Sequence, residues 1–267
     1  MKRYRLVYFL LLIFNSIHFP GQAQDSLLSN KKDTTLNAIG IKYDLSFFDK
    51  GVGKPWHLIT TEYSRKIKKT SLIARVNYAH RYSTSSVQFE GDAYPVLSRK
   101  IYAYVNVGYS PGNMLFPAFR SGMSLYFSLP AKFETEAGAR YLYFDKPIYI
   151  YTASIGKYYK QYWFNANTFL SPQNSNISAS LFLKSRYYLN DTDYIMLLLG
   201  TGLSPDNRVD NTLFNTYLKS KKAELSLRRS IQKHYILFLN TGFSHQQIQK
   251  DEYINQYNMS IGLQLGF

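Results

Sequence analysis

The sequence contains no cysteine, which excludes disulfide bonds, a thiol nucleophile and a lipid-anchored N-terminal cysteine. Acidic residues are scarce, with 17 Asp and Glu against 32 Lys and Arg, and the formal net charge is +15. Long apolar runs are also missing after residue 23, where the longest candidate spans residues 194–199. Because a membrane-spanning helix needs about 18 apolar residues, any membrane crossing after residue 23 must use β-strands.

The first 23 residues have the pattern of a secretory signal peptide. Three basic residues precede an apolar run at residues 6–14, and small residues at positions 21 and 23 indicate cleavage after Ala23. We therefore expect a signal peptide at residues 1–23, a periplasmic lead-in at 24–35 and one domain at 36–267. An uncleaved anchor is the alternative interpretation.

From residue 36 onward, short segments alternate between apolar and polar residues and are separated by turn residues. Period-two alternation is typical of β-strands, whose side chains point to opposite faces in turn. The 25 Tyr and 18 Phe fit the aromatic girdles of outer-membrane barrels. We predict an all-β fold, a single antiparallel transmembrane β-barrel of about 14 strands, with about 12 as the alternative. The least regular stretch is 214–231.

The last eleven residues, 257–267, show the clearest alternation and end on an aromatic residue. A soluble protein could bury the apolar parity in a core, whereas a barrel would turn it to lipid. The apolar set is Tyr257, Met259, Ile261, Leu263, Leu265 and Phe267. A terminal strand closing with Phe resembles the signal read by the outer-membrane assembly machinery. We therefore expect an assembly signal here, with that machinery and outer-membrane lipid as partners.

Charged residues occupy the polar parity of the predicted strands, which a barrel would turn into its lumen. They are Arg75, Arg81, Glu90, Asp92, Arg120, Glu134, Glu136, Arg140, Lys184 and Arg186. Their mixed signs on neighbouring strands favour an ion-pair network that fills the lumen. A polar path that selects solutes is the alternative.

The loop STSS should set the pairing of two of these strands, so that position 82 faces position 87. Glu90 would then have Arg81 as a diagonal neighbour, and Asp92 would have Arg75.

Four blocks of sequence resemble the YaiO-type outer-membrane β-barrel family. They are QFEGDAYPVL (88–97), GARYLYF (138–144), IYTASIGKYY (150–159) and YWFNANTFLSP (162–172). The resemblance extends from about residue 40 to residue 267 and implies one barrel in the cell outer membrane. It supplies no catalytic residues, because the function of the family is not established.

Enzyme motifs are missing, since the sequence has no GxSxG, HExxH, P-loop or EF-hand pattern. The histidines after residue 23 are His57, His80, His234 and His245. His57 and His245 could join Asp or Ser at the outer rim, but isolated rim histidines are the favoured interpretation. Residues 206–211 include four Asp and Asn that could hold Ca²⁺, although such loops are more often turns. We therefore expect no catalytic residues, no cofactor and no metal.

If the C-terminus is periplasmic, the strand order fixes the side of each connection and places most of their positive charge on the periplasmic side. We define the basic rim as Arg65, Lys66, Lys68, Lys69, Arg99, Lys100, Lys132, Lys157, Lys160 and Lys233, which share their side with Asp191 and Asp193. The rim could contact anionic partners or inner-leaflet headgroups, with ordinary solubilising turns as the alternative. No motif supports a nucleic-acid partner, and the oligomeric state stays open.

These patterns together predict a non-enzymatic integral outer-membrane barrel. We expect a structural or surface role and a narrow lumen filled by ion pairs. A porin-like channel for small solutes is the alternative, and an outer-membrane enzyme is less favoured.

Overall fold

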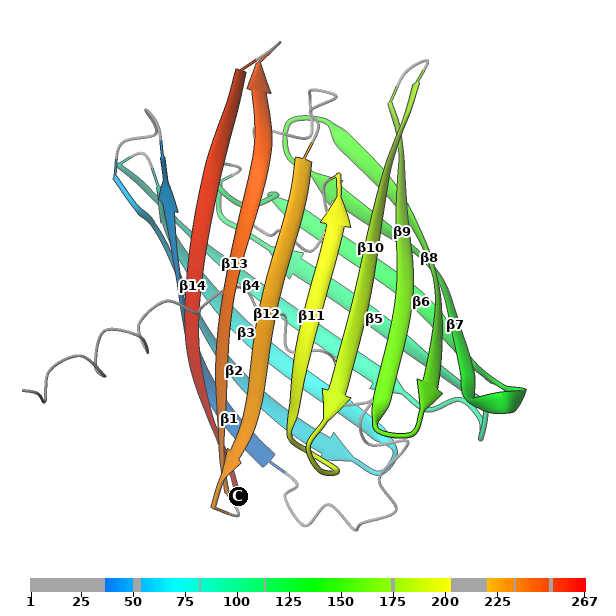
Figure 1. Cartoon of the computed structure of the whole chain (residues 1–267). Coiled ribbons are helices and arrows are strands. Elements are labelled where there is room, and N and C mark those ends of the chain that lie inside the picture. Colours follow the sequence, from blue (N-terminus) through cyan, green and yellow to red (C-terminus); the bar gives the residue numbers. More distant parts are fainter. Residues whose placement is uncertain are drawn as a thin grey trace, which may run out of the picture.

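The computed structural model describes residues 37–49, 54–81, 83–112, 114–173, 176–202, 220–232, 234–249 and 252–267. Within these residues the chain forms fourteen antiparallel strands that close into one barrel (Figure 1). The strands are β1 Asn37–Phe48, β2 Trp56–Ile67, β3 Thr70–Arg81, β4 Thr84–Pro95, β5 Ile101–Tyr109, β6 Phe119–Leu129, β7 Phe133–Tyr143, β8 Pro147–Tyr159, β9 Tyr162–Gln173, β10 Asn176–Tyr188, β11 Tyr194–Thr201, β12 Ser220–Ile231, β13 Tyr235–Gln249 and β14 Glu252–Gly266. One 3-10 turn, η1 (Pro130–Lys132), joins β6 to β7. The predicted all-β barrel of 14 strands is therefore confirmed.

Each strand pairs with its neighbours in chain order, and β1 closes the barrel against β14. The closing ladder runs from Ala38 opposite Gly266 to Phe48 opposite Gln256. At its lower end, the backbone N–H of Phe267 donates to the carbonyl of Asn37 at 2.8 Å. Closure removes the unpaired strand edges that an open sheet would expose.

The alternation of side chains separates an apolar outer face from a largely polar inner face. On β14, Tyr257, Ile261 and Leu263 are exposed on the outside, whereas Ser260 and Gln264 are buried inside. The other strands follow the same rule, because neighbouring side chains of a strand point to opposite faces. None of the helices in the described part of the chain is long and apolar enough to cross a membrane.

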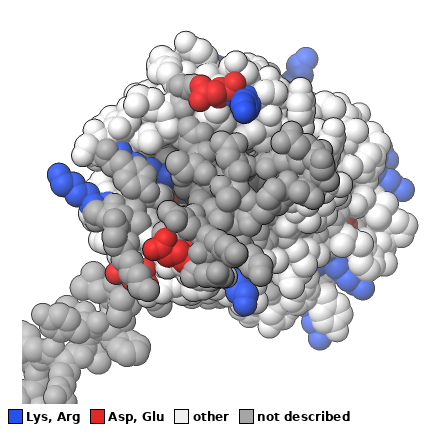
Figure 2. Space-filling model, turned by 90° about the horizontal axis from the view of Figure 1, so that it is seen from above, with Lys and Arg blue, Asp and Glu red and all other residues white. Residues whose placement is uncertain are grey.

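The two ends of the barrel differ in their connections. Both the start of β1 and the end of β14 lie at the lower end of Figure 1. Short turns dominate this end, and Lys68, Lys160 and Gln232 adopt positive φ in them. The upper end carries the longer connections, including residues 110–118 between β5 and β6. Seen from above, charged side chains of both signs lie around the upper rim (Figure 2).

The hairpin of β3 and β4 corrects the expected register. Arg81 pairs with Thr84, and Ser83 has a φ of 64°. Val87 faces Tyr78, and the expected proximity of Arg81 to Glu90 is wrong. Because the shift is an even number of residues, every side chain keeps its predicted face.

Several predicted features lie outside the described residues. These are the signal peptide at 1–23, the lead-in at 24–35, the Asp- and Asn-rich loop at 206–211, and Lys233. Of the irregular stretch 214–231, β12 accounts for Ser220–Ile231.

Candidate functional site in the barrel interior

A connected ionic network covers the inner face of β2 to β6, and Arg75 lies at its centre. The Arg75 Nε lies 3.3 Å from Glu62 Oε2, and its Nη1 lies 3.2 Å from Glu90 Oε2 and 2.8 Å from Asp92 Oδ2. All four side chains are at most 3% exposed. One guanidinium therefore contacts three buried carboxylates from two strands.

A second arginine reaches the network from β6 by crossing over β5. The Arg120 Nη1 lies 3.2 Å from Glu90 Oε1, although β5 separates the two strands. Gly108 stands between them, opposite Glu90 on one side and Arg120 on the other. A Cβ at position 108 would lie 2.7 Å from Arg120 Cγ, closer than side chains tolerate. The missing side chain of Gly108 therefore makes room for the ion pair.

Amide and hydroxyl groups complete the network. Asn77 Nδ2 donates to Glu90 Oε2 at 2.9 Å, and Thr60 Oγ1 donates to Asn77 Oδ1 at 2.9 Å. Asn106 Nδ2 donates to Asp92 Oδ1 at 2.5 Å, and its Oδ1 accepts from Arg120 Nε at 3.1 Å. We call Glu62, Arg75, Glu90, Asp92 and Arg120, with Asn77 and Asn106, the charged wall. Buried charges with this many partners are held in one arrangement.

A second polar group lies beside the charged wall on β6 to β8. Glu136 accepts hydrogen bonds from Ser124 Oγ at 2.7 Å and from Ser154 Oγ at 3.3 Å. Arg140 Nη2 lies 3.8 Å from Glu136 Oε1, and its guanidinium stacks 4.9 Å from the ring centre of Tyr104. Glu134 lies 3.5 Å from the hydroxyl of Tyr102. These contacts extend the polar surface around the barrel.

The remaining predicted lumen residues face inward but lie apart from the charged wall. The Arg81 guanidinium packs 4.0 Å from the ring centre of Trp56 at the upper end. Arg186 lies near the lower end with its guanidinium 4.9 Å from the ring centre of Trp163 and 4.1 Å from that of Tyr194. Lys184 is half-buried on the same strand, β10. The predicted set therefore divides between several sites.

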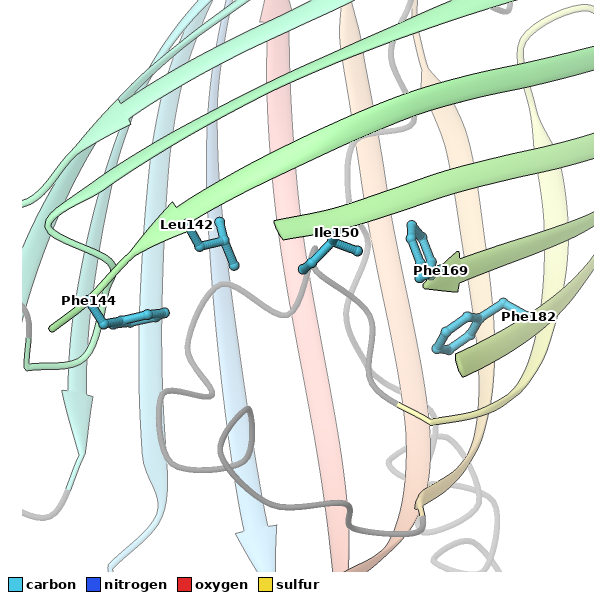
Figure 3. Close-up of a cluster of buried hydrophobic side chains, with 5 residues drawn as sticks. All are labelled: Leu142, Phe144, Ile150, Phe169 and Phe182. Carbon is cyan, nitrogen blue, oxygen red and sulfur yellow. The ribbon is translucent and has the colours of Figure 1, made fainter. Parts of the chain in front are cut away.

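The inner face next to the charged wall is apolar near the upper end, which the sequence analysis missed, and Leu142 pairs directly with Arg120. Leu142, Phe144, Ile150, Phe169 and Phe182 form one buried cluster on the inner side of β7 to β10 (Figure 3). We call these five residues the apolar wall. Four of them lie on the inward parity of their strands, so the alternation that identified the charged residues could have found them.

The sequence analysis also missed inward charges on β1, β2 and β12. Glu62, Lys42, Asp44 and Glu224 are all buried on the inner face. Lys42 Nζ lies 3.0 Å from Asp44 Oδ1 on the same strand. The same parity rule could have found them, since Lys42 and Asp44 alternate with the apolar residues of β1.

The described histidines do not build an enzyme-like site. His80 Nδ1 lies 2.9 Å from Ser85 Oγ on the outer surface. This is the hydrogen-bond distance expected between a general base and a serine nucleophile. Within the described chain, no third group that orients the His80 ring accompanies this pair. His245 Nδ1 lies 2.8 Å from Asn255 Oδ1, and His234 Nδ1 lies 3.2 Å from the Gly266 carbonyl. No group of three or more potential metal ligands occurs among the described His, Asp and Glu residues.

The lower end holds the described members of the basic rim on its surface. Lys68, Lys69, Arg99, Lys132 and Lys160 are all exposed there. This position gathers their positive charges at the lower edge of the barrel.

Asp193 lies at the same end but is buried within the turn between β10 and β11. Its Oδ1 accepts the backbone N–H of Ser230 on β12 at 2.8 Å, and its Oδ2 accepts Asn190 Nδ2 at 3.0 Å. Burial alone would raise the pKa of Asp193, but hydrogen bonds from Ser230, Asn190 and Thr192 outweigh it and lower that pKa. Asp193 therefore ties the turn between β10 and β11 to β12 and is not a free rim charge.

A closed antiparallel barrel with an apolar outer face and a polar inner face defines a transmembrane β-barrel of the outer membrane. The model of the YaiO membrane beta barrel domain matches residues 36–207, which is more than half of the chain. The protein belongs to this family and resides in the outer membrane. No curated protein matches the sequence.

Solved structures share the barrel at low sequence identity. The Pseudomonas putida toluene transporter TodX is 10% identical with a TM-score of 0.56, covering 95% of this chain and 96% of that chain. A bacterial polysaccharide outer membrane secretin is 10% identical with a TM-score of 0.58, covering 87% of this chain and 99% of that chain. The Acinetobacter baumannii outer membrane protein Omp33 is 10% identical with a TM-score of 0.53, covering 87% of this chain and all (100%) of that chain. At these identities the likeness concerns the fold alone.

Proposed function

We propose that this protein is a non-enzymatic outer-membrane barrel with a structural or surface role, whose lumen is narrowed by the charged wall. The observation that supports this most is the burial of Arg75, Glu90, Asp92 and Arg120, each at most 3% exposed in its side chain. Side chains that lined a wide water-filled pore would be solvated and more exposed. The charged wall therefore acts as packing inside the barrel.

Orientation follows from the connections. Outer-membrane barrels have short periplasmic turns and longer outer loops. We infer that the lower end, which has the short turns, the start of β1 and the end of β14, faces the periplasm. The basic rim then meets the inner leaflet, whose phospholipid headgroups include anionic ones.

A channel for small solutes is the second candidate, and the apolar wall favours it. Five buried apolar side chains face the lumen beside a polar wall, so an apolar solute could contact one side of the barrel. The fold is shared with a transporter described as carrying toluene. If this protein were such a channel, the apolar wall would line the path.

Electrical recording in planar lipid bilayers separates the two candidates. The wild-type barrel should show little or no conductance, and the double variant Arg75→Ala with Glu90→Ala should conduct more because the wall loses its central pair. Glu252→Ala, at an exposed position outside the wall, serves as the matched control. A large, steady wild-type conductance would contradict the narrowed lumen and favour the channel.

Catalysis is tested at the one described Ser–His contact. Phospholipid vesicles incubated with the wild type and with Ser85→Ala should release fatty acid at the same background rate. Hydrolysis by the wild type that is lost in Ser85→Ala would overturn the non-enzymatic assignment.

A further inference from the structure

Two histidines face each other on the outer surface near the upper end of the barrel. His57 on β2 is directly opposite His80 on β3, and the ring centres are 6.4 Å apart. Their neighbours Trp56 and Ala79 point inward and are buried, so both imidazoles point outward. Each ring is partly exposed, one residue from the upper end of its strand. The pair is therefore reachable from the surrounding solvent and headgroup region.

Each imidazole is hydrogen-bonded through its Nδ1 atom to a residue on the strand that lies on its other side. The His57 Nδ1 lies 2.7 Å from the hydroxyl of Tyr43 on β1, and the His80 Nδ1 lies 2.9 Å from Ser85 Oγ on β4. The hydroxyl of Tyr78 lies 3.0 Å from Ser85 Oγ and holds that serine in turn. Across the described residues, no hydrogen bond engages Nε2 of either ring.

This arrangement matches the way proteins prepare imidazole ligands. A ligating histidine commonly donates the N–H of its other ring nitrogen to an oxygen, which fixes the tautomer and the ring orientation. If Nδ1–H donates to Tyr43 in one ring and to Ser85 in the other, both Nε2 atoms keep a lone pair. Imidazole nitrogen suits Zn²⁺, Cu²⁺ and Ni²⁺, whereas Mg²⁺ and Ca²⁺ prefer oxygen ligands.

We propose that His57 and His80 form a two-histidine site for a divalent transition-metal ion on the outer surface of the barrel. Zinc–nitrogen bonds are about 2.0–2.1 Å long, so the two rings must turn towards each other around the ion. The partial exposure of both side chains leaves room for that rotation. With two protein ligands, the other coordination positions stay open to water or to a phosphate oxygen of a lipid headgroup. Such an open site exchanges its metal more readily than a closed four-ligand site.

Isothermal titration of the folded, detergent-solubilised protein tests the site, with an affinity tag that contains no histidine. ZnCl₂ should bind at one ion per barrel, and MgCl₂ should not bind at these residues. His57→Ala and His80→Ala should each weaken Zn²⁺ binding by at least about tenfold, because even the loss of an outer partner costs about 10–100-fold. Tyr43→Phe should weaken binding less than the loss of either histidine.

His245→Ala is the matched control. His245 is also partly exposed and near the upper end, and its Nδ1 contacts Asn255 at 2.8 Å. It faces Asn255 and Lys221 across its two strand pairs, so it lacks a histidine partner. This variant should keep wild-type affinity. Unchanged binding in the His57→Ala, His80→Ala double variant, or an equal loss in His245→Ala, would overturn the proposal.

A second measurement needs no variant. Zn²⁺ should protect His57 and His80, but not His245, from carbethoxylation by diethyl pyrocarbonate, as read by peptide mass spectrometry. Equal modification of all three with and without Zn²⁺ would also overturn the proposal. Neither experiment depends on whether the lumen conducts.

Discussion

Removing Glu90 tests whether the charged wall holds the barrel together. Glu90→Ala takes away three contacts at once, to Arg75 at 3.2 Å, to Arg120 at 3.2 Å and to Asn77 at 2.9 Å. Removing one partner of a buried ion pair typically costs about 3–5 kcal/mol. Because Arg75 keeps Glu62 and Asp92, we expect the lower part of that range, about 3 kcal/mol.

The companion change Arg75→Ala should cost more than Glu90→Ala. It leaves three neighbouring carboxylates without their shared guanidinium, and like charges held close together repel. The double variant Arg75→Ala with Glu90→Ala should cost less than the sum of the two single changes by about 1 kcal/mol or more. Each single change leaves the other member of this ion pair without its partner, and the double change removes both members.

The assay is reversible urea unfolding of the barrel in phospholipid vesicles. The fluorescence of the two tryptophans reports unfolding, and the gel shift of the unheated protein confirms a folded barrel. Glu252→Ala, at an exposed position, should stay within about 0.5 kcal/mol of the wild type. If Glu90→Ala matched this control, or if the two single changes were strictly additive, the charged wall would not be a coupled network.

Four further changes probe other parts of the molecule. Gly108→Ala should destabilise the barrel by about 1–3 kcal/mol in the same assay, because the new Cβ crowds Arg120. Gly91→Ala is the control and should hardly change stability. Its new Cβ would have Val107 Cγ2 as its nearest neighbour, at 3.8 Å. Asp193 has a lowered pKa in the folded state, so its stabilisation is present above the unfolded pKa of about 4 and is lost as pH falls through the folded pKa. Asp193→Asn should therefore flatten the loss of stability below about pH 4, and an unchanged pH profile would contradict this role. Deleting Phe267 should strongly reduce folded barrel in the outer membrane, whereas normal levels of heat-modifiable protein would remove the assembly-signal hypothesis. Cysteine at position 68 should resist an impermeant maleimide on intact cells, since labelling there would show that the lower end faces outward.

The strand pattern was predictable because alternation depends only on neighbouring residues. A barrel strand has one face in lipid and one in the interior, so parity alone places Arg75, Glu90 and Asp92 on the same side. The same rule places Tyr257 and Phe267 on the outer parity of the last strand. These predictions needed no knowledge of which strand residues pair.

Pairing was harder to predict because it depends on the backbone of the turn. The loop STSS contains turn-forming residues throughout, but Thr84 to Ser86 belong to β4. Among the four described residues of STSS, only Ser83 adopts positive φ, as expected for a tight hairpin whose twist matches that of the strands. The resulting register puts Arg75 directly opposite Glu90, where the expected register put Arg81 diagonally beside it.

The role of Gly108 could not be predicted from one sequence. Its importance depends on Glu90 and Arg120 meeting across it, and that requires the registers of two separate hairpins. Asp193 was equally hidden, because its partner Ser230 lies on β12, well beyond the turn that contains the aspartate. In both cases the decisive neighbour is distant in sequence.

The contact of Arg120 with Glu90 has a mechanical consequence. Because it links β4 to β6 over β5, neighbouring hairpins on this side are fastened by side chains as well as by backbone ladders. When such a barrel is pulled from a bilayer by its C-terminus, the hairpins leave in order from β14 towards β1. The pulling force should rise when β6 is reached, because extracting that strand also breaks the ion pair between Arg120 and Glu90 on β4.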